Sequence, residues 1–305
     1  MLFTPIKPML LTLKPEAFDD ERYIFEPKWD GWRILIHKKG DRIEAFTKNG
    51  RNVTDKFPEL EAVRHAIKID AAIVDCEGVC IRNGRSVFDD FQHRGRLSDK
   101  RRIAQALSTH PATFVTFDVL HDGTDRTKLP LSERKKILTD ILEPSDHIVP
   151  TMSIQGEGIR LKQGTEQWGW EGIVAKRLDS KYAIDTRSTQ WVKVKNWRQI
   201  DTVILGYRLN PQFGLIVGIN FPTVQNKPVA IVEFGFKPEE RQAFLGIAKQ
   251  LHRRVEKDVQ WIEPRLCCRV QYLERTERHH LRTVSFKGFL FDKQPDECKW
   301  VSYVQ

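Results

Sequence analysis

The sequence predicts an α+β protein with two domains, residues 1–199 and residues 200–305. Two observations support this prediction. The first part of the chain alternates strand-like and helix-like segments, whereas the second consists mainly of short strands separated by turn residues. The chain also has 305 residues, of which 40% are hydrophobic, so it is long enough to bury a core in each of two domains.

The first domain is predicted as a mixed α/β unit. Residues 32–50 have the pattern of two strands with a turn near residues 39–41. In the next helix Leu60, Val63 and Ile67 recur at helical spacing. A later helix has Ser132 as a plausible N-cap. The predicted helices are 57–68 and 131–142, and the further strands are 71–81, 113–120, 171–177 and 189–197.

The second domain is predicted to be rich in strands, with one amphipathic helix over residues 238–254. This helix starts at a proline and places Phe244, Ile247, Ala248 and Leu251 on one face. The predicted strands are 202–209, 214–220, 228–236, 267–275 and 281–289. Short strands and one helix in this length suit a small β-barrel such as an oligonucleotide-binding (OB) fold.

Charge and cysteine content narrow the functional classes. The formal net charge of +9 favours a polyanionic partner such as nucleic acid. Five cysteines without a CxxC pair argue against a disulfide framework or a structural zinc site, and they suit a reducing cytoplasm. The N-terminal residues do not resemble a signal peptide, and no apolar run is long enough to span a membrane. We therefore expect a cytoplasmic protein without a membrane partner.

Lys28 stands shortly before a predicted strand and is a candidate nucleophile. A free lysine has a pKa of about 10.4 and reacts poorly at neutral pH unless nearby cations, a metal or burial lower that pKa. Lys193 and Lys195 share one strand face with Trp191, so they could clamp a phosphate and depress the pKa of a neighbouring lysine. Glu171 leads an apolar strand, where its carboxylate could reach a cleft. Protective lysines on an edge strand are the alternative interpretation of residues 191–195.

Five short segments occur in one order along the chain, together with a distinctive C-terminal stretch. The segments are Lys28–Arg33 (KWDGWR), Asp75–Gly78 (DCEG), Phe117–Asp118, Glu171–Lys176 (EGIVAK) and Trp191–Lys195 (WVKVK). They resemble the successive motifs of the covalent nucleotidyltransferase superfamily, specifically ATP-dependent DNA ligases. Residues 271–293 resemble the end of the ligase domain in bacterial non-homologous end-joining ligases. The resemblance implies a nucleotidyltransferase (adenylation) domain with antiparallel sheets and helices, followed by an OB-fold domain.

The resemblance also implies a role for each matching position. Lys28 would take AMP from ATP as a lysyl phosphoramidate, and Lys193 and Lys195 would hold the α-phosphate and offset the charge of the departing pyrophosphate. Glu171, together with Glu77, would bind Mg²⁺ or Mn²⁺. The remaining nucleotide contacts would be Arg33 and Glu77 to ribose and phosphate, Phe117 stacked on adenine, and Glu26 in adenine recognition. Without the other motifs, Phe117 would be interpreted as a core aromatic in a buried strand.

Two positions depart from the family pattern. Lys48 stands where the family usually has a nucleotide-contacting arginine, and a lysine grips phosphate less specifically than a guanidinium. Leu290 stands where the family commonly has an arginine that helps orient pyrophosphate. Arg51 and Arg282 are near enough in sequence to substitute. These departures predict that charging with ATP is slow or that another cation serves. Gly31, between Asp30 and the strand, would let backbone and nucleotide approach closely.

The predicted partner is duplex DNA with nicks or ends, bound by a monomer in DNA repair. A Ku-like end-bridging protein is a further partner implied by the resemblance. The basic segments 249–257 and 274–282 could contact DNA, although either could equally be an ordinary solvated face. The alternatives are an RNA ligase or a GTP-dependent guanylyltransferase of the same superfamily, or a non-catalytic module that binds DNA ends.

Overall fold

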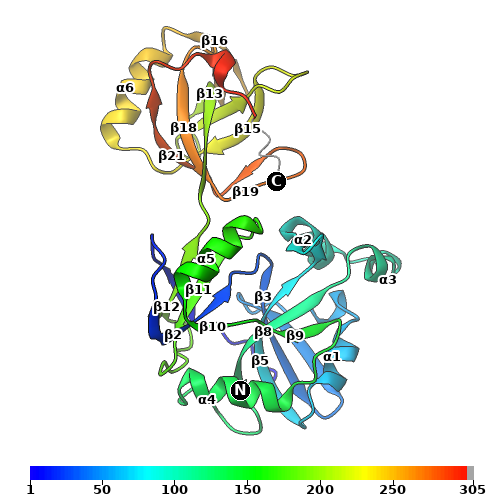
Figure 1. The fold of residues 1–305 in the computed structure, drawn as a ribbon. Coiled ribbons are helices and arrows are strands. Elements are labelled where there is room, and N and C mark those ends of the chain that lie inside the picture. Colours follow the sequence, from blue (N-terminus) through cyan, green and yellow to red (C-terminus); the bar gives the residue numbers. More distant parts are fainter. Residues whose placement is uncertain (301–305) are drawn as a thin grey trace. The chain divides into compact units, whose positions relative to one another are not determined.

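Strand β13 (Arg198–Arg208) begins the second of two units into which the chain divides, as Figure 1 shows. The computed structural model describes residues 1–300. The first unit is Met1–Asn196, and the second starts at Trp197. Residues 199–201, where the sequence places the domain boundary, are already part of β13.

The first unit contains two five-stranded sheets. One has the order β1 (Leu10–Leu13), β12 (Arg187–Lys195), β11 (Gly172–Arg177), β2 (Asp20–Pro27) and β10 (Ile154–Gly156). The other has the order β4 (Arg42–Thr47), β3 (Trp32–Lys39), β5 (Ala71–Val79), β8 (Thr113–His121) and β9 (Ile148–Pro150). The pairs β1–β12 and β8–β9 are parallel and the other pairs are antiparallel. The prediction of mixed helices and largely antiparallel sheets is confirmed.

The helices of the first unit lie between or after the strands. They are α1 (Leu60–Ala66), α2 (Phe88–Arg96), α3 (Lys100–Thr109), α4 (Leu131–Ile141) and α5 (Gly158–Gln167). Short elements complete the unit: β6 (Ile81–Arg82), β7 (Arg85–Ser86) and the 3-10 turn η1 (Thr54–Lys56). The predicted N-cap is wrong: Pro130 precedes α4, and Ser132 lies within its first turn. Within residues 1–300 no helix is both long and apolar enough to cross a bilayer.

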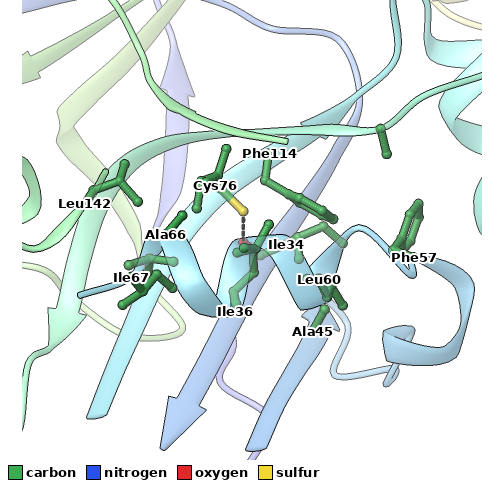
Figure 2. Close-up of a cluster of buried hydrophobic side chains, with 14 of the residues drawn as sticks. Ile34, Ile36, Ala45, Phe57, Leu60, Ala66, Ile67, Cys76, Phe114 and Leu142 are labelled. Atoms are coloured by element: carbon green, nitrogen blue, oxygen red, sulfur yellow. Dashed lines mark hydrogen bonds between the residues drawn. The ribbon is translucent and has the colours of Figure 1, made fainter. Parts of the chain in front are cut away.

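The sheet that contains β3 and β5 buries one face beneath α1. Figure 2 shows Ile34 and Ile36 of β3 beside Cys76 of β5, with Leu60 of α1 and Phe114 of β8 in the same cluster. The Cys76 thiol donates a hydrogen bond to the Ile34 carbonyl at 3.1 Å. Period-2 alternation therefore directs Ile34 and Ile36 to this side of the sheet and Leu35 to the other.

The two sheets of the first unit face one another. Leu35, Ile73 and Leu120 form a buried cluster with Ile24 of β2 and Trp191 of β12. On its other side the sheet of β2, β11 and β12 packs against Leu161 of α5, through Phe25, Ile173, Ala175, Val192 and Val194. Since Trp191 points between the sheets, strand alternation directs Lys193 and Lys195 to the same side, as the sequence predicts.

The second unit is built on a seven-stranded sheet. The path is β15 (Lys227–Val232), β14 (Gly214–Ile219), β13, β17 (Val259–Ile262) and β16 (His252–Glu256). Strand β18 (Cys267–Tyr272) pairs with β13 and with β21 (Ser285–Leu290). The short elements are β19 (Glu274–Arg275), β20 (Leu281–Arg282) and η2 (Pro295–Glu297). The fold is OB-like, but the strand pairings of residues 197–300 do not close the sheet into a ring, so the predicted barrel is open.

The helix of the second unit is shorter than predicted. Helix α6 is Pro238–Ala248, with the proline at its first position and Phe244 and Ala248 buried. Ile247 is exposed, so its predicted place on the buried face is wrong. Residues 252–254, predicted as the end of this helix, instead belong to β16 (His252–Glu256), because the backbone there pairs with β17. Tertiary pairing here overrides the helical spacing of the sequence.

A buried ion pair fixes α2 to the rest of the first unit. The side chains of Arg94 and Glu59 are fully buried, with Nη1 and Oε1 2.7 Å apart. Arg94 also donates to the His110 carbonyl, and the Ala112 N–H donates to Glu59. We expect Arg94→Ala to lower the free energy of unfolding by about 3–5 kcal/mol, because it leaves a carboxylate buried without its cation.

Urea unfolding followed by circular dichroism measures this loss. Arg160→Ala, which breaks an exposed pair with Glu157, is the matched control and should leave the transition almost unchanged. An Arg94→Ala transition as close to wild type as that of the control would contradict the expectation.

Candidate active site

A small cavity lies between the facing sides of the two sheets. Its lining residues come from β1, β2, β3, β5, β8 and β11 and from the segment after β2: Leu11, Glu26, Pro27, Lys28, Trp29, Arg33, Glu77, Phe117, Val174 and Lys176. The cavity volume is about 50 Å³.

Lys28 follows directly on β2 and is anchored at both ends. Its backbone N–H donates to the Gly172 carbonyl at 2.8 Å. Its ammonium donates to Glu171 Oε2 at 2.5 Å. The side chain is 19% exposed. The structure thus brings together Lys28 and Glu171, which are far apart in the sequence.

Two glycines explain why these residues can meet. Gly172 has φ of +140°, a conformation that favours glycine, and a Cβ there would lie 2.1 Å from the Val194 carbonyl oxygen. In a regular strand Glu171 and Ile173 would point to the same face. Here Ile173 packs against α5, whereas the Glu171 carboxylate contacts Lys28, so the alternation of β11 does not extend back to Glu171. Gly31 is required by the close approach of β5, because a Cβ at Gly31 would lie 2.0 Å from the carbonyl oxygen of Gly78.

The charges around Lys28 act against the predicted activation. Burial alone would lower the Lys28 pKa, but the carboxylates of Glu171 and Glu77 together raise it above its usual value. Lys193 and Lys195 repel the Lys28 ammonium, but the carboxylates outweigh this repulsion, so the Lys28 pKa is not lowered overall. Instead, burial and the neighbouring ammonium groups lower the pKa of Lys193. Lys28 is held as an ammonium ion until its carboxylate partners are neutralised.

Glu77 and Glu171 are two carboxylates whose charges both act on Lys28. Burial, with repulsion from Glu171 and Asp30, raises the pKa of Glu77 to about 7 even though Lys28 and Arg33 favour its charged form. Lys195 Nζ lies 3.5 Å from Glu171 Oε1. Oxygen ligands of this kind suit a hard divalent cation, which would relieve the repulsion between the two carboxylates. The residues present therefore fit Mg²⁺ or Mn²⁺.

Glu26 and Phe117 also line the cavity. Glu26 is buried between two lysines: Lys135 bonds Oε1, and Lys176 Nζ lies 2.6 Å from Oε2. Burial alone would raise the Glu26 pKa, but these two ammonium groups lower it overall. Arg33 lies 4.5 Å and Lys176 4.1 Å from the centre of the Phe117 ring. Phe117 is thus a cavity wall, although it is as buried as a core aromatic.

Sequence reasoning gave no role to several residues of this network. Lys176, whose pKa burial lowers to about 8, is in the interior of β11. The sequence signal that could have revealed Lys176 is the presence of a lysine in an otherwise apolar, buried strand. Asp75 holds Arg33 through two bonds of 2.5 and 2.6 Å, and the Tyr182 hydroxyl donates to the same carboxylate at 2.5 Å. No local pattern in the sequence pointed to Lys135 or Tyr182.

Some predicted residues lie outside the cavity lining. Lys48 is exposed, and its backbone N–H donates to the Arg33 carbonyl. Lys193 and Lys195 are half-buried beside Glu171 and Lys28, but they do not line the cavity. Leu290 packs in the second unit against a buried cluster that includes Cys267 and Cys298.

Comparison with known proteins places this site in context. The family described as "ATP dependent DNA ligase domain" matches residues 8–195. The bifunctional non-homologous end joining protein LigD of Bacillus subtilis is 30% identical over 97% of this chain and 50% of its own length. The SPbeta prophage-derived DNA ligase-like protein LigB of the same organism is 30% identical over 93% of this chain and 98% of its length.

Solved structures agree with the sequence comparison. Mycobacterial DNA ligase D complexed with ATP and MES shares 27% identity, with a TM-score of 0.57 over 96% of this chain and 97% of that one. The ligase domain of LigD from M. tuberculosis gives the same TM-score at 26% identity. The chain spans about half or less of the LigD proteins it matches.

Proposed function

The chain belongs to the ATP-dependent DNA ligases, and from this we propose that it seals 5′-phosphate/3′-hydroxyl breaks in duplex DNA. The observation that carries the proposal is the placement of Lys28. Its ammonium is held by Glu171, and Lys28 lines the same cavity as Phe117 and Glu26. A candidate nucleophile and a candidate base site therefore border one cavity.

The proposed reaction has three steps. The Lys28 amine loses its proton and attacks the α-phosphorus of ATP, forming an N–P bond as the bond to pyrophosphate breaks. AMP then passes to the 5′-phosphate at the break, which releases the lysine. Finally the 3′-hydroxyl attacks that phosphate, the phosphodiester forms, and AMP leaves. Positioning the strand ends supplies much of the rate.

The charged residues beside Lys28 would serve the first step. We propose that Lys193 and Lys195 offset negative charge at the α-phosphate and the leaving pyrophosphate. Glu171 and Glu77 would hold Mg²⁺ or Mn²⁺, which supplies charge neutralisation at phosphate oxygens when bound. Arg33, oriented by Asp75, would contact ribose or phosphate. Lys48 is exposed, so its side chain would have to move to contact the same nucleotide.

The part of the cavity lined by Phe117 and Glu26 would bind the base. The Phe117 ring offers a π-face for adenine. Glu26 is an acceptor for an exocyclic amino group, and the two lysines beside it keep it charged. This arrangement supports ATP as the nucleotide donor.

The cellular role is proposed from the named relatives. Proteins called non-homologous end joining LigD match nearly the whole chain. We propose a role in DNA repair in the bacterial cytoplasm, with a monomer acting on nicks or ends and a Ku-like protein bridging the ends. The sequence match and the open OB-like unit both suit a DNA substrate.

A sealing assay tests the activity. We expect the protein, ATP and magnesium to convert a nicked duplex that is labelled at the internal 5′-phosphate into a continuous strand. GTP in place of ATP, and an RNA nick in place of DNA, should give far less product. A preference for GTP or RNA would favour the other enzymes of the superfamily, and binding to nicks without ATP consumption would favour a non-catalytic module.

A further inference from the structure

Tyr182 is a buried tyrosine in the segment between β11 and β12, and it does not line the cavity. Its side chain belongs to the apolar cluster between the two sheets, where its ring packs edge-on against Trp191. A phenylalanine ring would fill the same space. Burying a hydroxyl group costs free energy unless a partner satisfies it. The contacts of this hydroxyl group therefore indicate what the tyrosine is for.

The Tyr182 hydroxyl joins two parts of the first unit. It donates to Asp75 Oδ2 at 2.5 Å and accepts from the Met9 backbone N–H at 3.3 Å. Burial and the negative charge of Asp75 raise the Tyr182 pKa well above its usual value. The hydroxyl therefore keeps its proton and remains a donor to this carboxylate.

Asp75 passes this constraint on to Arg33. The Asp75 side chain is fully buried, and its oxygens accept from Arg33 Nε at 2.5 Å and from Nη2 at 2.6 Å. The Tyr182 hydroxyl binds the same oxygen as Nη2, so it holds the carboxylate at one rotation. A guanidinium has five N–H groups, and these two bonds leave three of them for a ligand.

We propose that Tyr182 is a positioning residue for the nucleotide. Through Asp75 it fixes the direction in which Arg33 offers its remaining N–H groups to the ribose or phosphate of ATP. A guanidinium that is fixed before binding loses less freedom when the nucleotide arrives, so it binds more tightly. The inference rests on the proposed function, which makes Arg33 a contact of ATP.

Ser180 supplies a matched control for a purely structural role of the Tyr182 hydroxyl. The Ser180 hydroxyl lies in the same segment, accepts from the Trp191 indole N–H at 2.9 Å and donates to the Arg177 carbonyl at 2.6 Å. Within residues 1–300 it has no bond to Asp75. Removal of either hydroxyl leaves a buried N–H without its partner, so both variants should melt about 2–4 °C lower than the wild type.

Nucleotide affinity tests the inference. Titration calorimetry on pyrophosphate-treated protein measures binding of α,β-methylene-ATP, whose AMP cannot be transferred. We expect Tyr182→Phe to raise the dissociation constant by about five- to tenfold, whereas Ser180→Ala should leave it unchanged. In labelling by ATP, the half-saturating concentration should rise by the same factor, while the maximal rate changes by less than about twofold.

A double variant tests whether the effect passes through Arg33. Arg33→Lys keeps a cation for Asp75 but removes the guanidinium fork. Addition of Tyr182→Phe to this variant should change the dissociation constant by less than about twofold, since no fork is left to orient. In Tyr182→Phe alone, Arg33 stays paired with the buried carboxylate, so the variant turns the guanidinium without clearing the Phe117 ring.

The outcomes separate the inference from the proposed function. If Tyr182→Phe binds the analogue as tightly as Ser180→Ala does, or loses the same affinity with and without Arg33→Lys, the inference is overturned and labelling of the wild type still supports the function. If the wild type binds the analogue but ATP never labels it, the proposed function fails, while weaker binding by Tyr182→Phe still supports the inference. A wild type that binds no adenine nucleotide contradicts both.

Discussion

Lys28→Ala should carry no AMP after incubation with magnesium and ATP labelled at the α-phosphate, whereas the wild type should become labelled. The proposed mechanism has one nucleophile, and an alanine methyl group cannot form the phosphoramidate. Label on the wild type should pass to DNA when nicked duplex is added. The measurement is radioactivity on the denatured chain, separated by electrophoresis, before and after this chase.

Two controls make the result decisive. Lys39→Ala removes an exposed lysine at the end of β3 and should label as the wild type does. Protein that is already charged with AMP would not take label, so each sample is also treated with pyrophosphate first. Label that persists on Lys28→Ala would show that another residue is the nucleophile. A treated wild type that stays unlabelled would leave only the binding-module interpretation.

Glu171→Gln should have opposite effects on the two properties of Lys28. Glu171 raises the Lys28 pKa, so its loss should lower that pKa and make the free amine available at lower pH. The same change removes a proposed metal ligand and should slow labelling by ATP on the order of 10²–10³-fold, since each tenfold is about 1.4 kcal/mol of a contribution of several kcal/mol. A Lys28 amine that is free at lower pH, in a variant that is labelled more slowly by ATP, would separate the effect of Glu171 on the Lys28 pKa from its proposed metal binding.

The pH dependence of Lys28 modification shows in which direction Glu171 shifts the Lys28 pKa. In the wild type Lys28 stays protonated to a pH above that of an ordinary lysine, so an amine-specific reagent should modify it only at high pH. In Glu171→Gln the midpoint should move to lower pH, because burial then acts with less opposition. Peptide mapping follows Lys28 in both proteins, and Glu166→Gln on the exposed side of α5 is the control. An unchanged midpoint would mean that Glu171 does not hold the proton.

The sequence could predict elements that bury an apolar face. Strands β3, β5 and β8 and helix α1 have clear periodicity, and their cores follow it. Helix α2 could not be found in this way. It is fixed by Arg94, which is fully buried against Glu59, and no apolar stripe reports such an ion pair. The helix predicted through Arg254 failed because strand pairing at β16 outweighs helical spacing.

The candidate site was predictable in membership but not in electrostatics. The ordered motifs point to Lys28, Glu171 and Phe117; in the structure Lys28 and Phe117 line one cavity, and Glu171 contacts Lys28. The raised pKa of Lys28 could not be predicted, because it depends on how Gly172 turns Glu171 toward the ammonium. The charge on Glu26 likewise depends on Lys135, which is distant in sequence and in no motif.

The two cations packed on the Phe117 ring have a consequence for the affinity of nucleotide binding. A purine can stack on this ring only in molecules in which Arg33 or Lys176, which lie 4.5 and 4.1 Å from the ring centre, has moved away. If such molecules are a fraction f of the population, the apparent dissociation constant for ATP is the intrinsic constant divided by f. The fraction of protein that binds ATP at low ATP concentration then depends on how often Arg33 or Lys176 leaves the ring. A substitution that weakens their packing on Phe117 should raise this bound fraction without adding a contact to the nucleotide.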